Sequence, residues 1–208
     1  MAGYNLTAGK PQMEKIILGI DPGTNVMGYG LLQVSDRRPQ LIAMGVLKMK
    51  AVESHYLRLR RIYERVSQII TEFHPDELAI ESPYMGINPQ TMVKLCRGQG
   101  AAICAAVEHD LPVFEYPPAT IKMAIVGNGN AAKEQVRAML QRSLKIGEKD
   151  MVAQLDASDA LAAALCHFHK TSSPLAAASG RGTNNWKQFL ANNQGRVHKN
   201  VNPLEEKK

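Results

Sequence analysis

Residues 16–24 read IILGIDPGT, an apolar run that ends on an acid and a turn. The uninterrupted run from Ile16 to Ile20 is typical of a strand buried on both faces of a sheet. Asp21, Pro22 and Gly23 are residue types that favour a turn, so we expect the strand to end there. The first element is therefore predicted to be a central strand that ends at a carboxylate.

The segments that follow predict the rest of the fold. We expect strands at 27–34 and 41–48 around a polar turn at 35–39, a helix after Ser54, a strand at 77–81, a helix at 89–108, a strand at 112–116, a short helical piece, and helices at 131–144 and 155–169. Three consecutive strands followed by alternating helices and strands indicate an α/β fold with a mixed five-stranded sheet flanked by helices.

Composition and charge limit the class of protein. The 208 residues are 45% hydrophobic, which is enough for a core and argues against a wholly disordered chain. No window approaches the roughly 18 apolar residues of a membrane span, and the first 15 residues lack a signal-peptide core. We expect a cytoplasmic protein without a membrane partner. Three cysteines without a CxxC pair fit reduced thiols better than disulfides or zinc ligands.

Positive charge is concentrated near the end of the chain. Six Lys or Arg against two Glu in residues 171–208 supply +4 of the formal net charge of +6. We therefore expect a disordered lead at 1–14, one folded domain at 15–170 and a basic, disordered tail at 171–208. A basic tail suits a polyanionic partner such as nucleic acid, although it is also common as a solubilising end.

Four acids stand at the ends of predicted elements. Asp21 ends the first strand, Glu81 ends the fourth, and Asp156 and Asp159 open the last helix. Each has a structural alternative, such as a turn residue, an N-cap or a partner of the helix dipole. If the first and fourth strands are neighbours, however, all four carboxylates can meet. Carboxylate oxygens suit Mg²⁺, and two ions about 4 Å apart can assist displacement at phosphorus, so the set indicates a phosphodiester hydrolase.

Two helices carry further features. His167 and His169 lie at the end of the last helix, where we expect a dipole or surface role rather than metal ligation. The small-sided stretch 98–102 fits either a tight contact within the chain or a subunit interface.

Several motifs occur in a fixed order along the chain: GIDPGT at 19–24, GYG at 28–30, AIE at 79–81, VFEY at 113–116, KEQV at 133–136 and DASDALA at 156–162. In order and spacing they resemble the RuvC family of crossover junction endodeoxyribonucleases over residues 15–170. The resemblance implies an RNase H-like fold and a homodimer with two active sites. It also implies paired incisions in opposing strands of a four-way Holliday junction, which leave a 5′ phosphate and a 3′ hydroxyl.

The resemblance also implies roles for individual residues. Asp21, Glu81, Asp156 and Asp159 match the family's four acidic metal ligands, which would hold one or two Mg²⁺ ions, with Mn²⁺ as a substitute. The family acts with the RuvA and RuvB branch-migration proteins, so these are expected partners.

Three further residues match DNA contacts of the family. Lys122 and Lys133 match its basic residues at the DNA, although a solvated helix face is the structural alternative. Tyr84 matches an aromatic residue that enters the centre of the junction, where stacking on a base is available to it. The sequence Ser82-Pro83-Tyr84 departs from the more usual Gln-x-Phe after the glutamate.

Two other functions compete with a nuclease. The GIDPGT motif also resembles the first phosphate loop of sugar kinases and actin-like ATPases, but a second loop and a second large lobe are missing from 208 residues. A non-catalytic junction-binding module would tolerate loss of the acids. All four acids are present, which favours the enzyme.

Overall fold

The computed structural model describes residues 14–52, 54–83 and 88–172. Nearly all of the predicted lead and of the predicted tail lies outside these residues, as does Tyr84. The elements are β1 (Lys15–Asp21), β2 (Val26–Ser35), β3 (Arg38–Lys48), α1 (His55–Phe73), β4 (Glu77–Glu81), α2 (Pro89–Glu108), β5 (Val113–Tyr116), α3 (Pro118–Val126), α4 (Lys133–Leu144), the 3₁₀ helix η1 (Glu148–Asp150) and α5 (Leu155–Ser172). None of the helices in the described ranges is both long and apolar enough to span a membrane.

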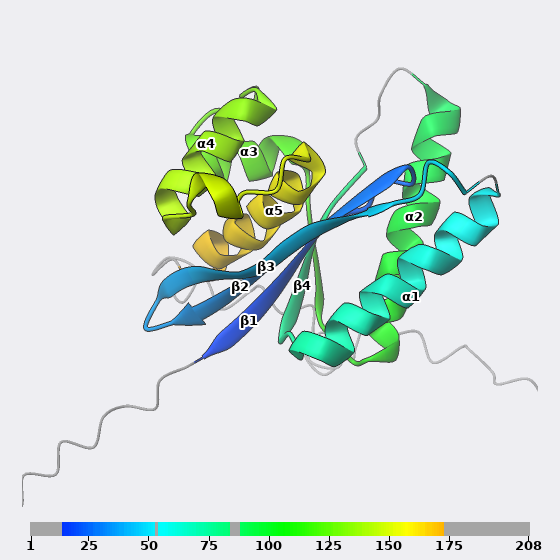
Figure 1. Ribbon diagram of the computed structural model, residues 1–208, viewed down its shortest axis with the longest axis horizontal. Coiled ribbons are helices and arrows are strands. Elements are labelled where there is room, and N and C mark those ends of the chain that lie inside the picture. Colours follow the sequence, from blue (N-terminus) through cyan, green and yellow to red (C-terminus); the bar gives the residue numbers. More distant parts are fainter. Residues whose placement is uncertain (1–13, 53, 84–87, 173–208) are drawn as a thin grey trace, which may run out of the picture. The chain divides into compact units, whose positions relative to one another are not determined.

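The strands form one mixed sheet in the order β3-β2-β1-β4-β5. The first three strands are antiparallel neighbours, whereas β4 lies parallel to β1 and β5 parallel to β4. Helices α1 and α2 cover one face of the sheet, and α3, α4 and α5 cover the other (Figure 1). The predicted mixed five-stranded α/β fold is confirmed, including the adjacency of the first and fourth strands.

Strand β1 faces two separate cores. Ile17 packs in the core under α3, α4 and α5, whereas Leu18 and Ile20 pack in the core under α1 and α2. All three side chains are almost fully buried because successive residues of a strand point to opposite faces. The continuous apolar run therefore reflects a strand that is covered on both sides.

Strand β3 begins earlier than the sequence predicts. The turn before it contains only Asp36 and Arg37, both with positive φ, and Pro39 already pairs with Val34 of β2. Because proline has no N–H to donate, its presence in a sequence favours the prediction of a turn. Because β3 is an edge strand, the missing donor is tolerated there.

Candidate active site

Two acids meet at one edge of the sheet. Ile20 of β1 pairs with Ile80 of β4 in a parallel register, so the next residues, Asp21 and Glu81, end neighbouring strands. Alternation along each strand turns both side chains toward the face covered by α5. The chain bends immediately after β1, where the Gly23 N–H donates to the Asp21 carbonyl at 3.0 Å. The predicted convergence of these two acids is observed.

Helix α5 reaches this edge because glycines let its backbone approach the strands. A Cβ added at Gly19 would lie 2.0 Å from the Ala160 carbonyl oxygen, and one at Gly28 would lie 1.9 Å from the Asp156 carbonyl oxygen. Gly30, which pairs with Gly19 across the two strands, likewise leaves no room for a side chain. The glycines therefore allow the first turns of α5, and the acids on them, to lie against β1 and β2.

These glycines position the site, a role that their place in the sequence motifs does not by itself predict. Gly28 and Gly30 are two residues apart and so share one face of β2. Two glycines on one face of a strand indicate that another backbone packs closely there. The spacing does not indicate which helix makes the contact.

The charges of the four carboxyl groups act on one another. Burial and then the charges of Glu81 and Asp159 raise the pKa of Asp21 well above its usual value. Burial and then Asp159 raise the pKa of Glu81 to about 7. Burial also raises the pKa of Asp159, and Asp156 adds to this effect. Each group thus disfavours the negative charge of its neighbours, and a bound cation would relieve that repulsion.

Both predicted lysines lie beside the acids. Lys133 is the first residue of α4, and its Nζ forms an ion pair with an Asp159 carboxylate oxygen. Burial alone would lower the pKa of Lys133, but the hydrogen bond to Asp159 and the nearby acids outweigh it and raise the pKa. The charge of Lys122 on α3 lowers the pKa values of Glu81 and Asp159. Positive charge therefore adjoins the acids from the α3 and α4 side.

The donor chemistry of this cluster fits a hard divalent cation. Carboxylate oxygens are the ligands that Mg²⁺ prefers, and four partly buried carboxyl groups lie close enough here for the charges of three to act on Asp21. Within residues 14–52, 54–83 and 88–172, no three Asp, Glu, His or Cys side chains form a ready-made metal-binding group. In this structure Lys133 supplies the direct positive partner of Asp159.

The loop after β4 leaves directly from the acidic cluster. The Ser82 N–H donates to the Tyr116 carbonyl at 2.9 Å, which extends the pairing of β4 with β5 by one residue. Tyr84 follows two residues later and lies outside the described residues. Its role as a DNA contact therefore stays a prediction.

The expectation of a dipole or surface role is wrong for His167. The sequence predicts that it lies at a helix end, but α5 continues to Ser172 and the His167 side chain is fully buried against the sheet. Its Nε2 contacts the Glu77 carboxylate, and its Nδ1 lies 2.7 Å from the Tyr116 hydroxyl. Glu77 also pairs with Lys15. His169, by contrast, is exposed as predicted.

The small-sided stretch of α2 makes a tight contact within the chain. A Cβ added at Gly98 would lie 2.8 Å from the Thr24 side chain and 3.0 Å from the Pro22 carbonyl oxygen. Helix α2 therefore packs directly on the turn that follows Asp21. Gly100 has no such neighbour within 4 Å, which leaves this position open for a subunit contact.

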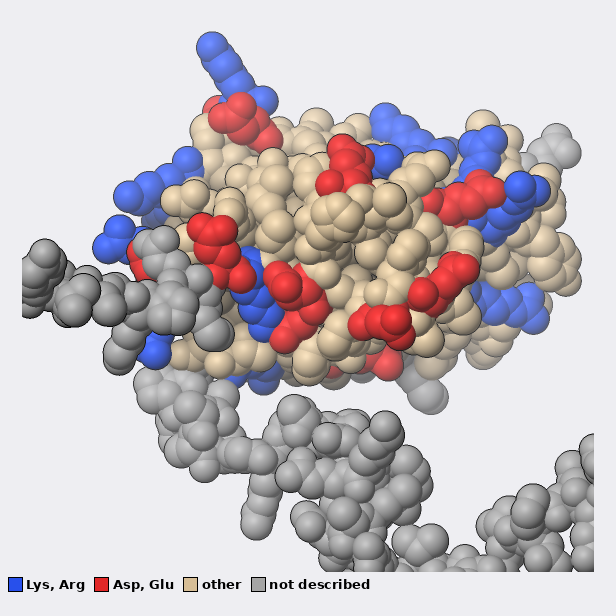
Figure 2. All heavy atoms as spheres, turned by 90° about the horizontal axis from the view of Figure 1, so that it is seen from below, with Lys and Arg blue, Asp and Glu red and all other residues tan. Residues whose placement is uncertain are grey.

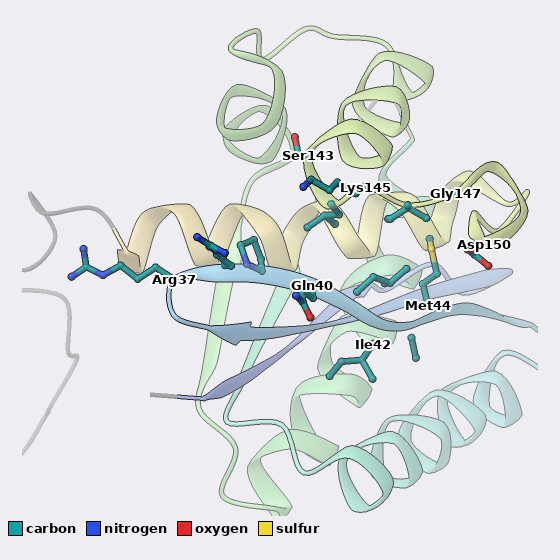
Figure 3. Close-up of a pocket in the computed structure, with 14 residues that line it drawn as sticks. Arg37, Gln40, Ile42, Met44, Ser143, Lys145, Gly147 and Asp150 are labelled. Atoms are coloured by element: carbon teal, nitrogen blue, oxygen red, sulfur yellow. The ribbon is translucent and has the colours of Figure 1, made fainter. Parts of the chain in front are cut away.

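A cavity of about 820 Å³ lies elsewhere, between β3 and the segment from the end of α4 to η1. Figure 3 labels Arg37, Gln40, Ile42 and Met44 on one side of it and Ser143, Lys145, Gly147 and Asp150 on the other. None of the predicted site residues lines this cavity. The acidic cluster is instead at the edge of the sheet.

Comparison with known proteins agrees with this site. Residues 17–167 match the family model described as crossover junction endodeoxyribonuclease RuvC. A protein of that name from Porphyromonas gingivalis is 52% identical over 184 residues, which cover 88% of this chain and 97% of the relative. One from Bacteroides fragilis is 53% identical over 188 residues, covering 90% and 98%.

Solved structures support the same relationship. Thermus thermophilus RuvC is 32% identical and superposes with a TM-score of 0.66, covering 75% of this chain and 95% of that one. A second structure of T. thermophilus RuvC, in complex with a Holliday junction substrate, has the same identity and TM-score, covering 74% and 92%. The predicted RNase H-like fold is thereby confirmed. The chain belongs to the RuvC family of crossover junction endodeoxyribonucleases.

Proposed function

We propose that this protein resolves Holliday junctions by metal-dependent hydrolysis of phosphodiester bonds in two opposing strands. The observation that supports the proposal is that β1 and β4 end side by side at Asp21 and Glu81, and that, in addition to burial, the charges of Glu81, Asp159 and Asp156 all raise the pKa of Asp21. A relative of the same family is known in complex with a Holliday junction substrate, which supports the choice of DNA.

Asp21, Glu81, Asp156 and Asp159 would hold one or two Mg²⁺ ions, with Mn²⁺ as a substitute. When bound there, the metal makes a water molecule a better nucleophile and stabilises the charge that develops on the phosphate and the leaving oxygen. The strand ends and the first turns of α5 fix the positions of the four carboxylates. The products would be a 5′ phosphate and a 3′ hydroxyl.

Lys122 and Lys133 would hold the DNA backbone beside these acids. Lys133 opens a helix of 12 residues, where free backbone N–H groups and the helix dipole favour a phosphate. Its ammonium group already lies next to Asp159, so a phosphate bound there would be adjacent to the carboxylates. We propose that Tyr84 stacks on a base at the junction centre.

Two incisions in opposing strands require two such centres, and we propose a homodimer. Along α2, Val93 and Val107 are exposed apolar side chains, and Cys96 and Cys104 are exposed thiols. These four residues are placed symmetrically about Gly100, four and seven positions to either side. These side chains form a narrow, weakly polar stripe along α2 with a glycine at its centre. Such a stripe supports close packing against a second copy of the helix.

The remaining expectations stay predictions. We propose that the protein acts in the cytoplasm and together with RuvA and RuvB. The family match over residues 17–167 favours the nuclease over a non-catalytic module and over a kinase-like phosphotransferase.

A labelled mobile four-way junction with Mg²⁺ tests the proposal, with Asp21→Asn as the variant and linear duplex as the control DNA. We expect paired nicks in the junction, none in the duplex, and loss of cleavage with retained binding in the variant. Binding without cleavage by the wild type would instead indicate a junction-binding module.

A further inference from the structure

Positive side chains cluster on the side of the acidic centre opposite to Lys122 and Lys133. Arg58 of α1 and Lys94 and Arg97 of α2 surround His55, whose pKa is lowered by burial and then by these three charges. In the described ranges none of the three forms an ion pair with a carboxylate. Three neighbouring cations without an acidic partner create a local positive potential, which attracts a polyanion.

Figure 2 shows the face seen from below relative to Figure 1, where acidic and basic side chains are both present. The cluster of Arg58, Lys94 and Arg97 differs from such a mixed face, because the charged groups that act on His55 there are all positive.

A cavity of about 350 Å³ connects this cluster with the acidic centre. Its polar lining comes from Thr24, Asn25, Arg58, Thr91, Lys94 and Asp156. Hydroxyl, amide and cationic groups of this kind are donors to an anion, and Asp156 belongs to the proposed metal-binding set. A ligand in the cavity would therefore lie directly beside the phosphate on which the acids act.

Arg58 and Lys94 differ in their local surroundings. The Arg58 guanidinium is held by neutral acceptors, since its Nε donates to the Val52 carbonyl at 2.6 Å and another nitrogen donates to the Asn25 side chain. Its positive charge consequently remains unneutralised. Lys94 is exposed and has no hydrogen bond or ion pair among the described residues, so its ammonium group is available to a ligand.

Packing of α2 on the β1–β2 turn brings Lys94 to the cavity. Gly98 contacts Thr24 closely, and Lys94 lies one helical turn before Gly98 on the same side of α2. The position of Lys94 relative to Asp156 is therefore set by a tight backbone contact.

We propose that this cavity binds a backbone phosphate of the DNA strand being cut, next to the scissile phosphate, with Lys94 as its main ligand. Arg58 adds positive charge, and Thr24 and Thr91 offer hydroxyl donors. This inference rests on the proposed junction-cleaving function and assigns it a second phosphate contact. The cut strand would be held from the α3 and α4 side by Lys122 and Lys133 and from the α1 and α2 side by Lys94.

The test uses the full chain with a fluorescent four-way junction in chelator, so that binding is measured without cleavage. Lys94→Gln is compared with the wild type and with Lys170→Gln, which changes an exposed lysine at the other end of α5. Losing one phosphate contact should weaken binding about 5- to 10-fold at low salt and reduce the slope of log K against log salt by about 0.9. The Lys170 variant should match the wild type in both measurements.

Junctions with one neutral methylphosphonate in place of a phosphate then locate the contact. Neutralising the phosphate next to the cleavage position should weaken the wild type but not Lys94→Gln. If Lys94→Gln binds as the wild type does, while the wild type still makes paired nicks with Mg²⁺, this inference is overturned and the proposed function stands. A wild type that neither binds nor cuts the junction overturns both.

Discussion

Glu81 ends β4, and its side chain is partly buried. The charges of Asp159 and two lysines act on its pKa. Burial is the largest cause that raises its pKa from 4.5 to about 7, and the charge of Asp159 adds to it, whereas Lys133 and Lys122 oppose it. In the metal-free protein this carboxyl group therefore ionises near neutral pH. The fold places a carboxylate where its negative charge is unfavourable until a cation binds.

This placement predicts how stability depends on pH. Because the folded pKa lies above the unfolded one, protonated Glu81 stabilises the fold at pH below about 4.5, and this contribution is lost as pH rises toward 7. In chelator, Glu81→Gln should be about 1–2 kcal/mol more stable than the wild type at pH 8, with little difference at pH 4. Urea unfolding at both pH values measures this. Equal pH dependence of the variant and the wild type would contradict the account, and Glu72→Gln, in an exposed position of α1, is the control.

Other contacts at the residue scale are not encoded in a local pattern. The ion pair of Lys133 with Asp159 joins residues of two different helices. Gly28 of β2 lies directly against the backbone of α5. Sequence spacing places Asp156 and Asp159 on one face of a helix, but it does not say which strands that face meets. The four acids were therefore predicted from their places at the ends of elements and the two lysines from the resemblance, whereas their arrangement required the structure.

At the scale of elements, a buried network ties three of them together. Glu77 of β4, Tyr116 of β5 and His167 of α5 are joined by hydrogen bonds, and the Phe114 ring lies 4.4 Å from the His167 ring. Tyr116 is also the register partner of Glu81. The network therefore fixes α5 and β5 around the strand that carries an acid of the site.

Removing one hydrogen bond of this network tests its contribution. Tyr116→Phe leaves the buried Nδ1 of His167 without its partner and should lower the free energy of unfolding by about 1–2 kcal/mol. Tyr56→Phe is a matched control, because Tyr56 is 75% exposed and should tolerate the change. Urea denaturation of both variants decides the point, and equal stability of the two would show that the network adds nothing.

The elements differ in how well the sequence predicts them. The bounds of β4 and α2 agree with the prediction because Pro75-Asp76 and Asn88-Pro89 mark their starts, and the Asn88 side chain accepts from the N–H groups of Gln90 and Thr91. The start of β3 was predicted too late because the tolerance for Pro39 depends on which strand is at the edge. His167 was misplaced because burial of the end of α5 depends on tertiary packing.

At the scale of the whole molecule, the proposed paired incision would depend on a second copy of the chain. An antiparallel pairing of α2 with its copy, centred on Gly100, would place Cys96 opposite Cys104 of the partner subunit. Mild oxidation should then yield a covalent dimer on a non-reducing gel. Cys104→Ser should abolish the product, whereas Cys166→Ser should leave it unchanged because Cys166 is buried. A crosslink that persists in Cys104→Ser would place the interface elsewhere.

The central claim is that four carboxylates from two strand ends and one helix act as one metal-dependent centre. The most direct measurement is the rate of junction cleavage at saturating Mg²⁺ for Asp21→Asn, Glu81→Gln, Asp156→Asn and Asp159→Asn, with Glu72→Gln as the control. We predict that each of the four loses about 100-fold or more in rate while the control cuts as the wild type does. Any one of the four that cleaves at the wild-type rate would contradict the single four-carboxylate centre.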